Sequence, residues 1–387
     1  MNKRLIIIIS ALVLLLLIGG GIYYYFAKQK AAPGATVPET LFPTAGEGGG
    51  GGIPGLFKPG GGTKEKPKLV RLSDEPVAGF IALTRGRIRY AERATGHIYE
   101  VSGNGEDKIR ISNTTIPRVY HTIWSPKGDH VALSALDEDQ NAKHFLATLT
   151  GTTTEGVFLP TGATPYAFSA TDQIAYLAAL NGNYSVIVAD PKNQKQKAVY
   201  TSPFRDFIVA WPADNIFGLA TKPSGTVGGY LYKLDTKTNT FNKVLGGITG
   251  LEALWSPDAE NILISKFDNR ASEISASVVD KQGIKIKNLG NTLATKCAWS
   301  RSDAKALYCA MPKTRPSATY PDDWYKGKVA LEDDIQKLYL TASSSETILT
   351  DKKFDVTQVG IDARDEYLYF LDKTDWGLWG LKLTTNN

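Results

Sequence analysis

The sequence has few of the residues that usually carry chemistry, with two cysteines and four histidines among 387 residues. It contains no Gly-x-Ser-x-Gly elbow, which excludes a hydrolase domain of the kind that this motif marks. No glycine loop follows a predicted strand to hold a phosphate, so we expect no cofactor. We also expect no metal, because the histidines lack the spacing of a metal site; they are His97, His121, His130 and His144.

A large excess of one charge is also missing from most of the chain. The formal net charge is +5, of which residues 1–30 carry +4 and residues 31–68 carry +1. Residues 69–387 are therefore neutral overall. A neutral domain has no general electrostatic attraction for nucleic acid, so we expect no nucleic-acid partner.

One long hydrophobic run is present, at residues 5–26, and its 22 residues are enough to span a membrane as a helix. We interpret residues 1–31 as an uncleaved signal-anchor with short basic flanks. A cleaved signal peptide is the alternative, but the run exceeds a usual signal core and no convincing cleavage site follows. The short basic leader favours a cytoplasmic N-terminus. We thus expect a single-pass cell-membrane protein whose C-terminal domain is extracytoplasmic, either periplasmic or at the cell surface.

Residues 32–67 include eleven glycines and several prolines. This composition cannot bury a hydrophobic core, and it is typical of a flexible tether. The remaining residues, 68–387, form the predicted folded domain.

A short phrase, Trp-Ser-Pro, repeats within that domain at Trp124 and Trp255. Each copy reads as a strand, a tight turn and a second strand. Degraded copies extend the pattern, and the four steps from Trp124 to Trp299 are 44, 43, 44 and 44 residues long. Seven residues after each marker, a small or apolar residue opens the second strand, which identifies two further units. The markers are Ile81, Trp124, Phe168, Trp211, Trp255, Trp299 and Ile361.

A period of 40–45 residues with four short strands per unit is the signature of a β-propeller blade. The sequence therefore predicts an all-β, seven-bladed propeller. The seventh unit ends without a fourth strand, and Lys68–Leu72 precedes the first marker by the distance expected of one. We expect this N-terminal strand to complete the last blade and close the ring, which removes an open sheet edge.

The Trp-Ser-Pro phrase resembles the Trp-Ser-Pro-Asp-Gly repeats of TolB-like, WD40-like and dipeptidyl-peptidase-type propellers. The resemblance covers about residues 68–387 and implies the fold rather than an activity. The whole arrangement is similar to that of uncharacterised membrane-anchored bacterial propeller proteins.

The repeat is interrupted once, since Trp299 and Ile361 are 62 residues apart. The extra residues lie between the second and third strands of the sixth unit, on the face where propeller channels usually bind partners. Aromatic and charged residues there suit a peptide or glycan contact, because long loops on rigid scaffolds often carry function. A lid whose Trp324 merely packs on a neighbouring blade is an equal alternative. The candidate binding residues are Arg315, Tyr320, Asp322, Asp323, Trp324 and Tyr325.

A second candidate site is the channel lining. The residues three positions before the markers share one layer, and four of them are polar: His121, Glu252, Lys296 and Gln358. They could bind a small polar ligand, but we favour a simply wet channel.

The two cysteines, Cys297 and Cys309, fall on adjacent strands of the sixth unit. They could form a cross-strand disulfide in an oxidising compartment. We expect two buried thiols instead, because a shift of one residue in register would point them to opposite faces.

These observations favour a membrane-anchored extracytoplasmic scaffold or adaptor that binds a protein or a cell-envelope polymer without catalysis. The alternative is a carbohydrate-active enzyme, a lyase or glycosidase, that uses His121, Glu252 and Lys296 at the channel mouth. A purely structural element of an envelope assembly is a third possibility.

Overall fold

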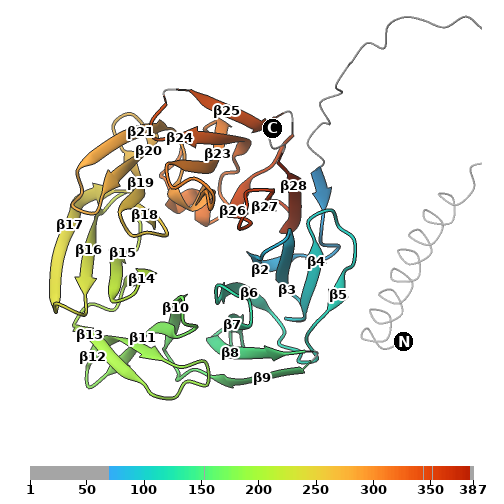
Figure 1. Ribbon diagram of the computed structural model, residues 1–387. Coiled ribbons are helices and arrows are strands. Elements are labelled where there is room, and N and C mark those ends of the chain that lie inside the picture. The colour runs from blue at the N-terminus through green and yellow to red at the C-terminus, as the bar shows by residue number, and fades with distance from the viewer. Residues whose placement is uncertain (1–68, 152, 343, 351, 384–387) are drawn as a thin grey trace, which may run out of the picture. The chain divides into compact units, whose positions relative to one another are not determined.

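The structure, a computed structural model, describes residues 69–151, 153–342, 344–350 and 352–383. Its strands form seven four-stranded antiparallel sheets arranged as a ring (Figure 1). The predicted all-β, seven-bladed propeller is confirmed. The predicted signal-anchor and tether lie outside the described residues. No helix within the described ranges has the length and hydrophobicity needed to cross a membrane.

Each blade runs from an inner strand at the channel to an outer strand at the rim, in chain order for the first six. Blades one to three are β2 (Val77–Ala82), β3 (Arg87–Glu92), β4 (Ile98–Ser102) and β5 (Ile109–Arg110); β6 (Val119–Trp124), β7 (His130–Leu136), β8 (Ala142–Thr150) and β9 (Thr153–Phe158); and β10 (Thr164–Phe168), β11 (Ile174–Leu180), β12 (Asn183–Ala189) and β13 (Lys197–Ser202). Blades four to six are β14 (Phe207–Ala213), β15 (Ile216–Thr221), β16 (Gly228–Asp235) and β17 (Thr240–Thr249); β18 (Glu252–Trp255), β19 (Asn261–Asp268), β20 (Glu273–Asp280) and β21 (Lys285–Gly290); and β22 (Cys297–Trp299), β23 (Ala306–Thr314), β24 (Glu332–Tyr339) and β25 (Ser345–Leu349). A 3₁₀ turn, η1 (Ala294–Lys296), precedes β22.

Blade seven combines the two ends of the domain. It consists of β26 (Val356–Ile361), β27 (Tyr367–Asp372), β28 (Gly377–Lys382) and β1 (Leu69–Arg71). β1 pairs antiparallel with β28, with Val70 opposite Gly380. In Figure 1 the blue N-terminal strand lies beside the red C-terminal blade. The predicted closure is confirmed, and it removes the free edge that an open β28 would present.

The repeated phrase has a packing explanation. Trp299 is buried and its indole Nε1 donates a hydrogen bond of 3.1 Å to the carbonyl of Leu254 in blade five. Trp255 packs on Gly218 of blade four, where a Cβ would lie 2.2 Å from the indole nitrogen, so only glycine fits there. These two markers therefore join neighbouring blades, as large buried rings are suited to do.

The serine of the phrase closes the hairpin. Ser125 Oγ accepts a hydrogen bond from the backbone N–H of His130 at 3.0 Å. Ser256 Oγ does the same for Asn261 at 2.9 Å. In both copies the acceptor satisfies the first backbone donor of the second strand, a frequent role of serine in turns.

Cys297 and Cys309 are directly opposite each other in the β22–β23 pairing and form a disulfide with an S–S distance of 2.10 Å. The expectation of two free thiols is wrong. The hairpin places both side chains on the same face, and this register could not be fixed from the sequence alone.

Candidate binding site on the loop-bearing face

The loops that join second to third strands, and those that join one blade to the next, share one face of the propeller. The extra residues of blade six emerge on this face, between β23 and β24. They include a short helix, α2 (Asp322–Tyr325). We call residues 315–331 the lid.

The lid has its own small hydrophobic core. Tyr320 and Trp324 have no exposed surface, and both belong to a buried cluster that includes Phe267 and Ile274 of blade five and Leu331. The Tyr320 hydroxyl donates a hydrogen bond of 2.8 Å to the Pro316 carbonyl. Tyr320 and Trp324, two of the predicted binding residues, therefore hold the lid in place through buried packing. For Trp324 this corresponds to the alternative of a lid that packs on a neighbouring blade.

The two aspartates of α2 make structural contacts as well. Asp322 Oδ2 accepts a hydrogen bond of 2.6 Å from the backbone N–H of Gly225, which lies in the β15–β16 loop of blade four. Asp323 Oδ2 accepts one of 2.9 Å from the N–H of Thr319, and its carboxylate pairs with Lys328 at 2.8 Å. The Lys328 ammonium holds the pKa of Asp323 below its usual range. Asp322 thus ties the lid to blade four, whereas Asp323 stays within it.

Arg315 and Tyr325 are the lid candidates that remain exposed. Arg315 forms an ion pair with Glu273 at 3.4 Å, a surface contact that contributes little to stability. Tyr325 is 48% exposed, and its hydroxyl donates a hydrogen bond of 2.6 Å to Glu252 Oε1.

Glu252 opens β18 and is 8% exposed. Its other oxygen accepts hydrogen bonds from Ser265 Oγ at 3.0 Å and from the Thr295 N–H at 3.3 Å. Burial raises the pKa of Glu252 above its usual range, and the hydrogen bond from Tyr325 opposes that rise. The structure therefore brings together one residue from each of the two predicted sites, Tyr325 from the lid and Glu252 from the channel layer.

Lys296, predicted to line the channel, has no exposed surface. Its Nζ donates hydrogen bonds to Asp333 Oδ2 at 2.7 Å, Asp355 Oδ1 at 2.9 Å and the Val356 carbonyl at 2.7 Å. The Trp324 indole donates to Asp355 at 2.8 Å and lies 4.6 Å from the ammonium. Lys296 therefore points under the lid rather than into the channel.

The other two layer residues have separate surroundings. His121 is exposed, and Gln358 Nε2 donates a hydrogen bond of 3.2 Å to the Phe80 carbonyl of blade one. Lys296 is committed to two carboxylates, and among the described residues no hydrogen bond or ion pair joins His121, Glu252 and Lys296 to one another. Within the described ranges, no three His, Cys, Asp or Glu side chains are grouped as a metal site would require.

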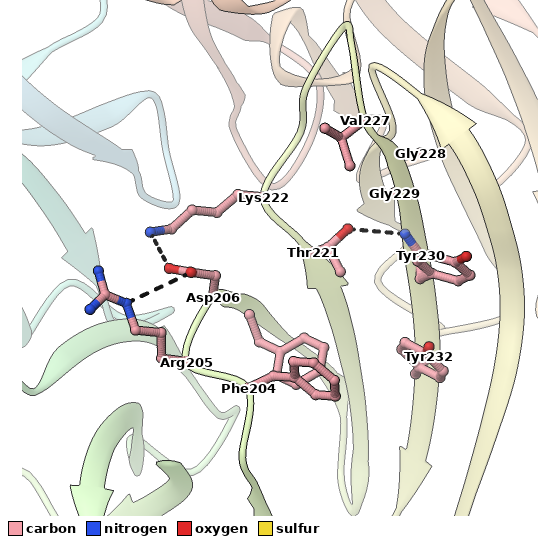
Figure 2. Close-up of a pocket in the computed structure, with 11 residues that line it drawn as sticks. Phe204, Arg205, Asp206, Thr221, Lys222, Val227, Gly228, Gly229, Tyr230 and Tyr232 are labelled. Atoms are coloured by element: carbon pink, nitrogen blue, oxygen red, sulfur yellow. Dashed lines mark hydrogen bonds and ion pairs between the residues drawn. The ribbon is translucent and has the colours of Figure 1, made fainter. Parts of the chain in front are cut away.

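The loop-bearing face holds a cleft that is not among the sites predicted from the sequence (Figure 2). Its volume is about 670 Å³, and it lies between the link from β13 to β14 and the facing ends of β15 and β16. Three of its apolar side chains are strongly exposed, Phe204 at 69%, Val227 at 66% and Tyr230 at 39%. The lining residues are Phe204, Arg205, Asp206, Phe207, Thr221, Lys222, Val227, Gly228, Gly229, Tyr230 and Tyr232.

A series of stacked rings begins with two residues that line this cleft and continues to blade three. Tyr230 and Tyr232 are nearly parallel, with ring centroids 6.3 Å apart and an interplanar angle of 18°. Tyr232 stacks in turn on Phe241 at 4.8 Å, and Phe241 on Tyr200 of blade three at 4.6 Å. The cleft is thus the outer opening of the contact between blades three and four.

The charged groups of the cleft lie together on one side, opposite the tyrosines in Figure 2. Lys222 Nζ is 2.8 Å from Asp206 Oδ1, and Arg205 Nε is 3.7 Å from Asp206 Oδ2. The Lys222 ammonium lowers the pKa of Asp206. With two cations and one carboxylate, this side carries one net positive charge.

The sequence held a weak signal for the cleft. Phe204 stands in a link between blades, outside any strand, where a large apolar side chain has no obvious core to enter. The pair Tyr230 and Tyr232 shares one face of a strand, but the same pattern occurs in buried strands. Whether such a tyrosine pair is buried or lines a cleft depends on the packing of blades three and four.

A larger opening of about 1040 Å³ lies at the opposite end of the channel, among the turns that follow the markers. Its charged lining residues are Lys127 and Arg301. Trp124 and Trp255 also line it, but both are buried through their packing between blades. This opening is the end of the channel, whereas the cleft is formed by exposed side chains outside the ring of markers.

Comparisons with known proteins agree on the architecture. No protein-family model and no curated protein matches the chain. Among solved structures, an oligogalacturonate lyase in complex with manganese matches with a TM-score of 0.57 and 10% identity, covering 83% of this chain and 94% of the lyase. The β-propeller domain of Cps50 (Swd1) from Myceliophteria thermophila matches with a TM-score of 0.56 and 11% identity, covering 82% of this chain and 100% of that domain.

TolB from Acinetobacter baumannii is also similar, with a TM-score of 0.45 and 14% identity over 77% of this chain. The chain spans 63% of the length of that protein. The seven four-stranded sheets and the two matches with a TM-score above 0.5 define the class as a β-propeller, so the resemblance predicted from the Trp-Ser-Pro phrase is confirmed at the level of the fold. At these identities the comparisons show the fold alone.

Proposed function

We propose that this protein is a non-catalytic scaffold that binds a protein partner in the cleft on the loop-bearing face. The observation that carries the proposal is the exposure of Phe204, Val227 and Tyr230 around one cavity. Clustered exposed apolar side chains mark interaction sites on otherwise polar surfaces. Aromatic residues are also enriched where partners bind.

The proposal includes the location predicted from the sequence, with the propeller outside the cytoplasm and anchored through residues 5–26. The disulfide between Cys297 and Cys309 supports an exported domain. Disulfides persist in oxidising compartments and are rare in the cytosol. A tethered propeller there could hold a protein at the membrane surface.

A photo-crosslinking experiment on the full chain in its native membrane tests the proposal. A photoreactive residue replaces Val227, on the cleft wall, or Ile284, just before β21 of blade five. Both are 66% exposed, so they are equally accessible. We expect a discrete protein adduct from position 227 and none from position 284.

Matched phenylalanine substitutions identify the surface involved. Phe204→Ser should remove the adduct at position 227, whereas Phe158→Ser, at a rim residue that is 61% exposed, should leave it. Equal adducts at positions 227 and 284, or an adduct unaffected by Phe204→Ser, would contradict the proposal.

The carbohydrate-active enzyme is the weaker candidate because Lys296 is enclosed by Asp333 and Asp355. One observation keeps it testable: Glu252 and the half-exposed Tyr325 form a close pair at the channel. Cleavage of a glycan by the full chain that is lost in Glu252→Gln, with unchanged melting temperature, would favour the enzyme over the scaffold.

A further inference from the structure

The cleft is too small for a folded surface to enter. Its volume of about 670 Å³ lies in the range of small-ligand pockets. A protein partner must therefore insert a few side chains from a protruding or extended segment. Extended segments bind such grooves through one or two anchors rather than through a broad interface.

Two side-chain acceptors of the cleft are already engaged within it. Thr221 Oγ1 accepts a hydrogen bond of 3.0 Å from the Tyr230 N–H, and Asp206 is paired with Lys222. A glycan would need free acceptors as well as donors for its hydroxyl groups. The open surface is instead formed by the rings of Phe204 and Tyr230 and by Val227, which suits an apolar anchor.

The parallel rings of Tyr230 and Tyr232 favour one kind of anchor. Grooves lined by aromatic rings recognise proline-rich segments, whose polyproline II conformation is already extended before binding. Such a segment loses little conformational entropy on binding. The tyrosine pair provides this type of groove, and Phe207 contacts both Tyr232, at 6.3 Å between ring centroids, and Phe204, at 6.4 Å.

The positively charged side chains of the cleft favour acidic residues next to the anchor of the bound segment. Arg205 and Lys222 have side chains that are 70% and 61% exposed, and Asp206 pairs with both. A guanidinium and an ammonium together offer eight N–H donors, more than one carboxylate can accept. Unused donors and one net positive charge complement an acidic group.

From these steps we propose that the cleft binds an extended proline-containing peptide segment that carries acidic residues beside its apolar anchor. This inference rests on the proposed function and specifies the partner. The proline and the anchor pack against Phe204, Tyr230 and Val227, and the acidic residues pair with Arg205 and Lys222.

Fluorescence anisotropy on the full chain tests the inference with three labelled twelve-residue peptides. The first contains two prolines, a phenylalanine and a third proline, followed by two aspartates. The second has lysines in place of the aspartates, and the third has alanines in place of the prolines. We expect the acidic proline peptide to bind about tenfold more tightly than either of the others, a difference of about 1.4 kcal/mol.

Variants assign the two parts of the site. The double substitution Arg205→Gln and Lys222→Gln should remove the preference for aspartate over lysine. Phe204→Ser should weaken the acidic peptide about tenfold, whereas Phe158→Ser should not change its affinity. Raising the salt concentration should weaken the acidic peptide most, because exposed charge pairs are screened.

Equal binding of the acidic and basic peptides, or no binding of any peptide, would overturn this inference. If no peptide binds but the adduct at position 227 still depends on Phe204, the scaffold function stands and the ligand class is wrong. If the adduct is also absent, the proposed function is overturned as well.

Discussion

The hydroxyl of Tyr325 lies 2.6 Å from Oε1 of Glu252 and donates a hydrogen bond to it, across a separation of 73 residues. Tyr325 ends α2 in the lid of blade six, and Glu252 opens the inner strand of blade five. This contact joins the lid to the channel wall. It also gives a buried carboxylate one of its few donors, so its energy depends on the protonation of Glu252.

Tyr325→Phe should lower the free energy of unfolding by about 1–3 kcal/mol at neutral pH, the usual cost of leaving a buried acceptor unpaired. Burial raises the pKa of Glu252 in the folded state. The free energy of unfolding therefore falls as the pH rises from the pKa of this group in the unfolded chain to its higher pKa in the fold. Without the Tyr325 hydroxyl the pKa rises further. The loss should therefore be larger at pH 8 than at pH 4, as measured by urea unfolding.

Tyr339→Phe is the matched control, because its hydroxyl contacts the exposed Glu346 at 3.4 Å. It should cause no measurable change at either pH. An equal loss in Tyr325→Phe at pH 4 and pH 8 would show that ionised Glu252 does not depend on this donor.

The sequence was sufficient for the architecture because a propeller repeats one local pattern. The 44-residue spacing and the small or apolar opening of each second strand were enough to place Ile81 and Ile361, and the missing fourth strand of the seventh unit pointed to β1. Each of these features depends on local strand and turn chemistry. Local features of this kind produce a periodic pattern, so they can be predicted from the sequence.

The site was less predictable because it depends on side-chain direction. Lys296 occupies the expected position in the chain, but Asp333 in β24 and Asp355, just before β26, bind its ammonium under the lid. The cleft requires the packing of blades three and four, which no single repeat encodes. The disulfide depends on the register of β22 and β23, and a shift of one residue would place the two cysteines on opposite faces.

Lys296→Met should destabilise the protein strongly, because it leaves the buried carboxylates of Asp333 and Asp355 without their cation. Removing one partner of a buried ion pair costs about 3–5 kcal/mol. Burial already raises the pKa of Asp333, which shows how poorly the site solvates a free charge. Urea unfolding at neutral pH measures the effect.

Lys353→Met is the control for charge removal, since Lys353 pairs with Glu332 at 3.4 Å and its side chain is 84% exposed. Its unfolding curve should coincide with that of the original protein. Similar curves for Lys296→Met and Lys353→Met would mean that Lys296 is not enclosed as described.

Replacing Cys297 and Cys309 together by alanine should lower the free energy of unfolding by about 2–3 kcal/mol, the chain-entropy effect expected for a short closed loop. The two residues are 12 positions apart. Dithiothreitol should lower the melting temperature of the original protein and leave that of the double variant unchanged. Reaction of the denatured, unreduced protein with iodoacetamide would instead reveal free thiols.

Asp322→Ala should loosen the wall of the cleft without touching any residue that lines it. Asp322 accepts a hydrogen bond from the Gly225 N–H, and Gly225 lies in the loop that leads from Lys222 to Val227. The loop keeps a second tie, from the Gly250 N–H to the Ser224 carbonyl, so it should become mobile without unfolding. Hydrogen exchange in residues 222–227 should accelerate, and the acidic proline peptide should bind several-fold more weakly because a looser wall must be ordered on binding.

Asp323→Ala separates this effect from damage to the lid. Asp323 bonds to Thr319 and Lys328, both within the lid, so its loss should accelerate exchange there and leave residues 222–227 unchanged. If both variants weaken the peptide equally, the lid acts on the cleft through its overall stability. If Asp322→Ala alone does so, the hydrogen bond from Gly225 couples the lid of blade six to the binding site of blade four.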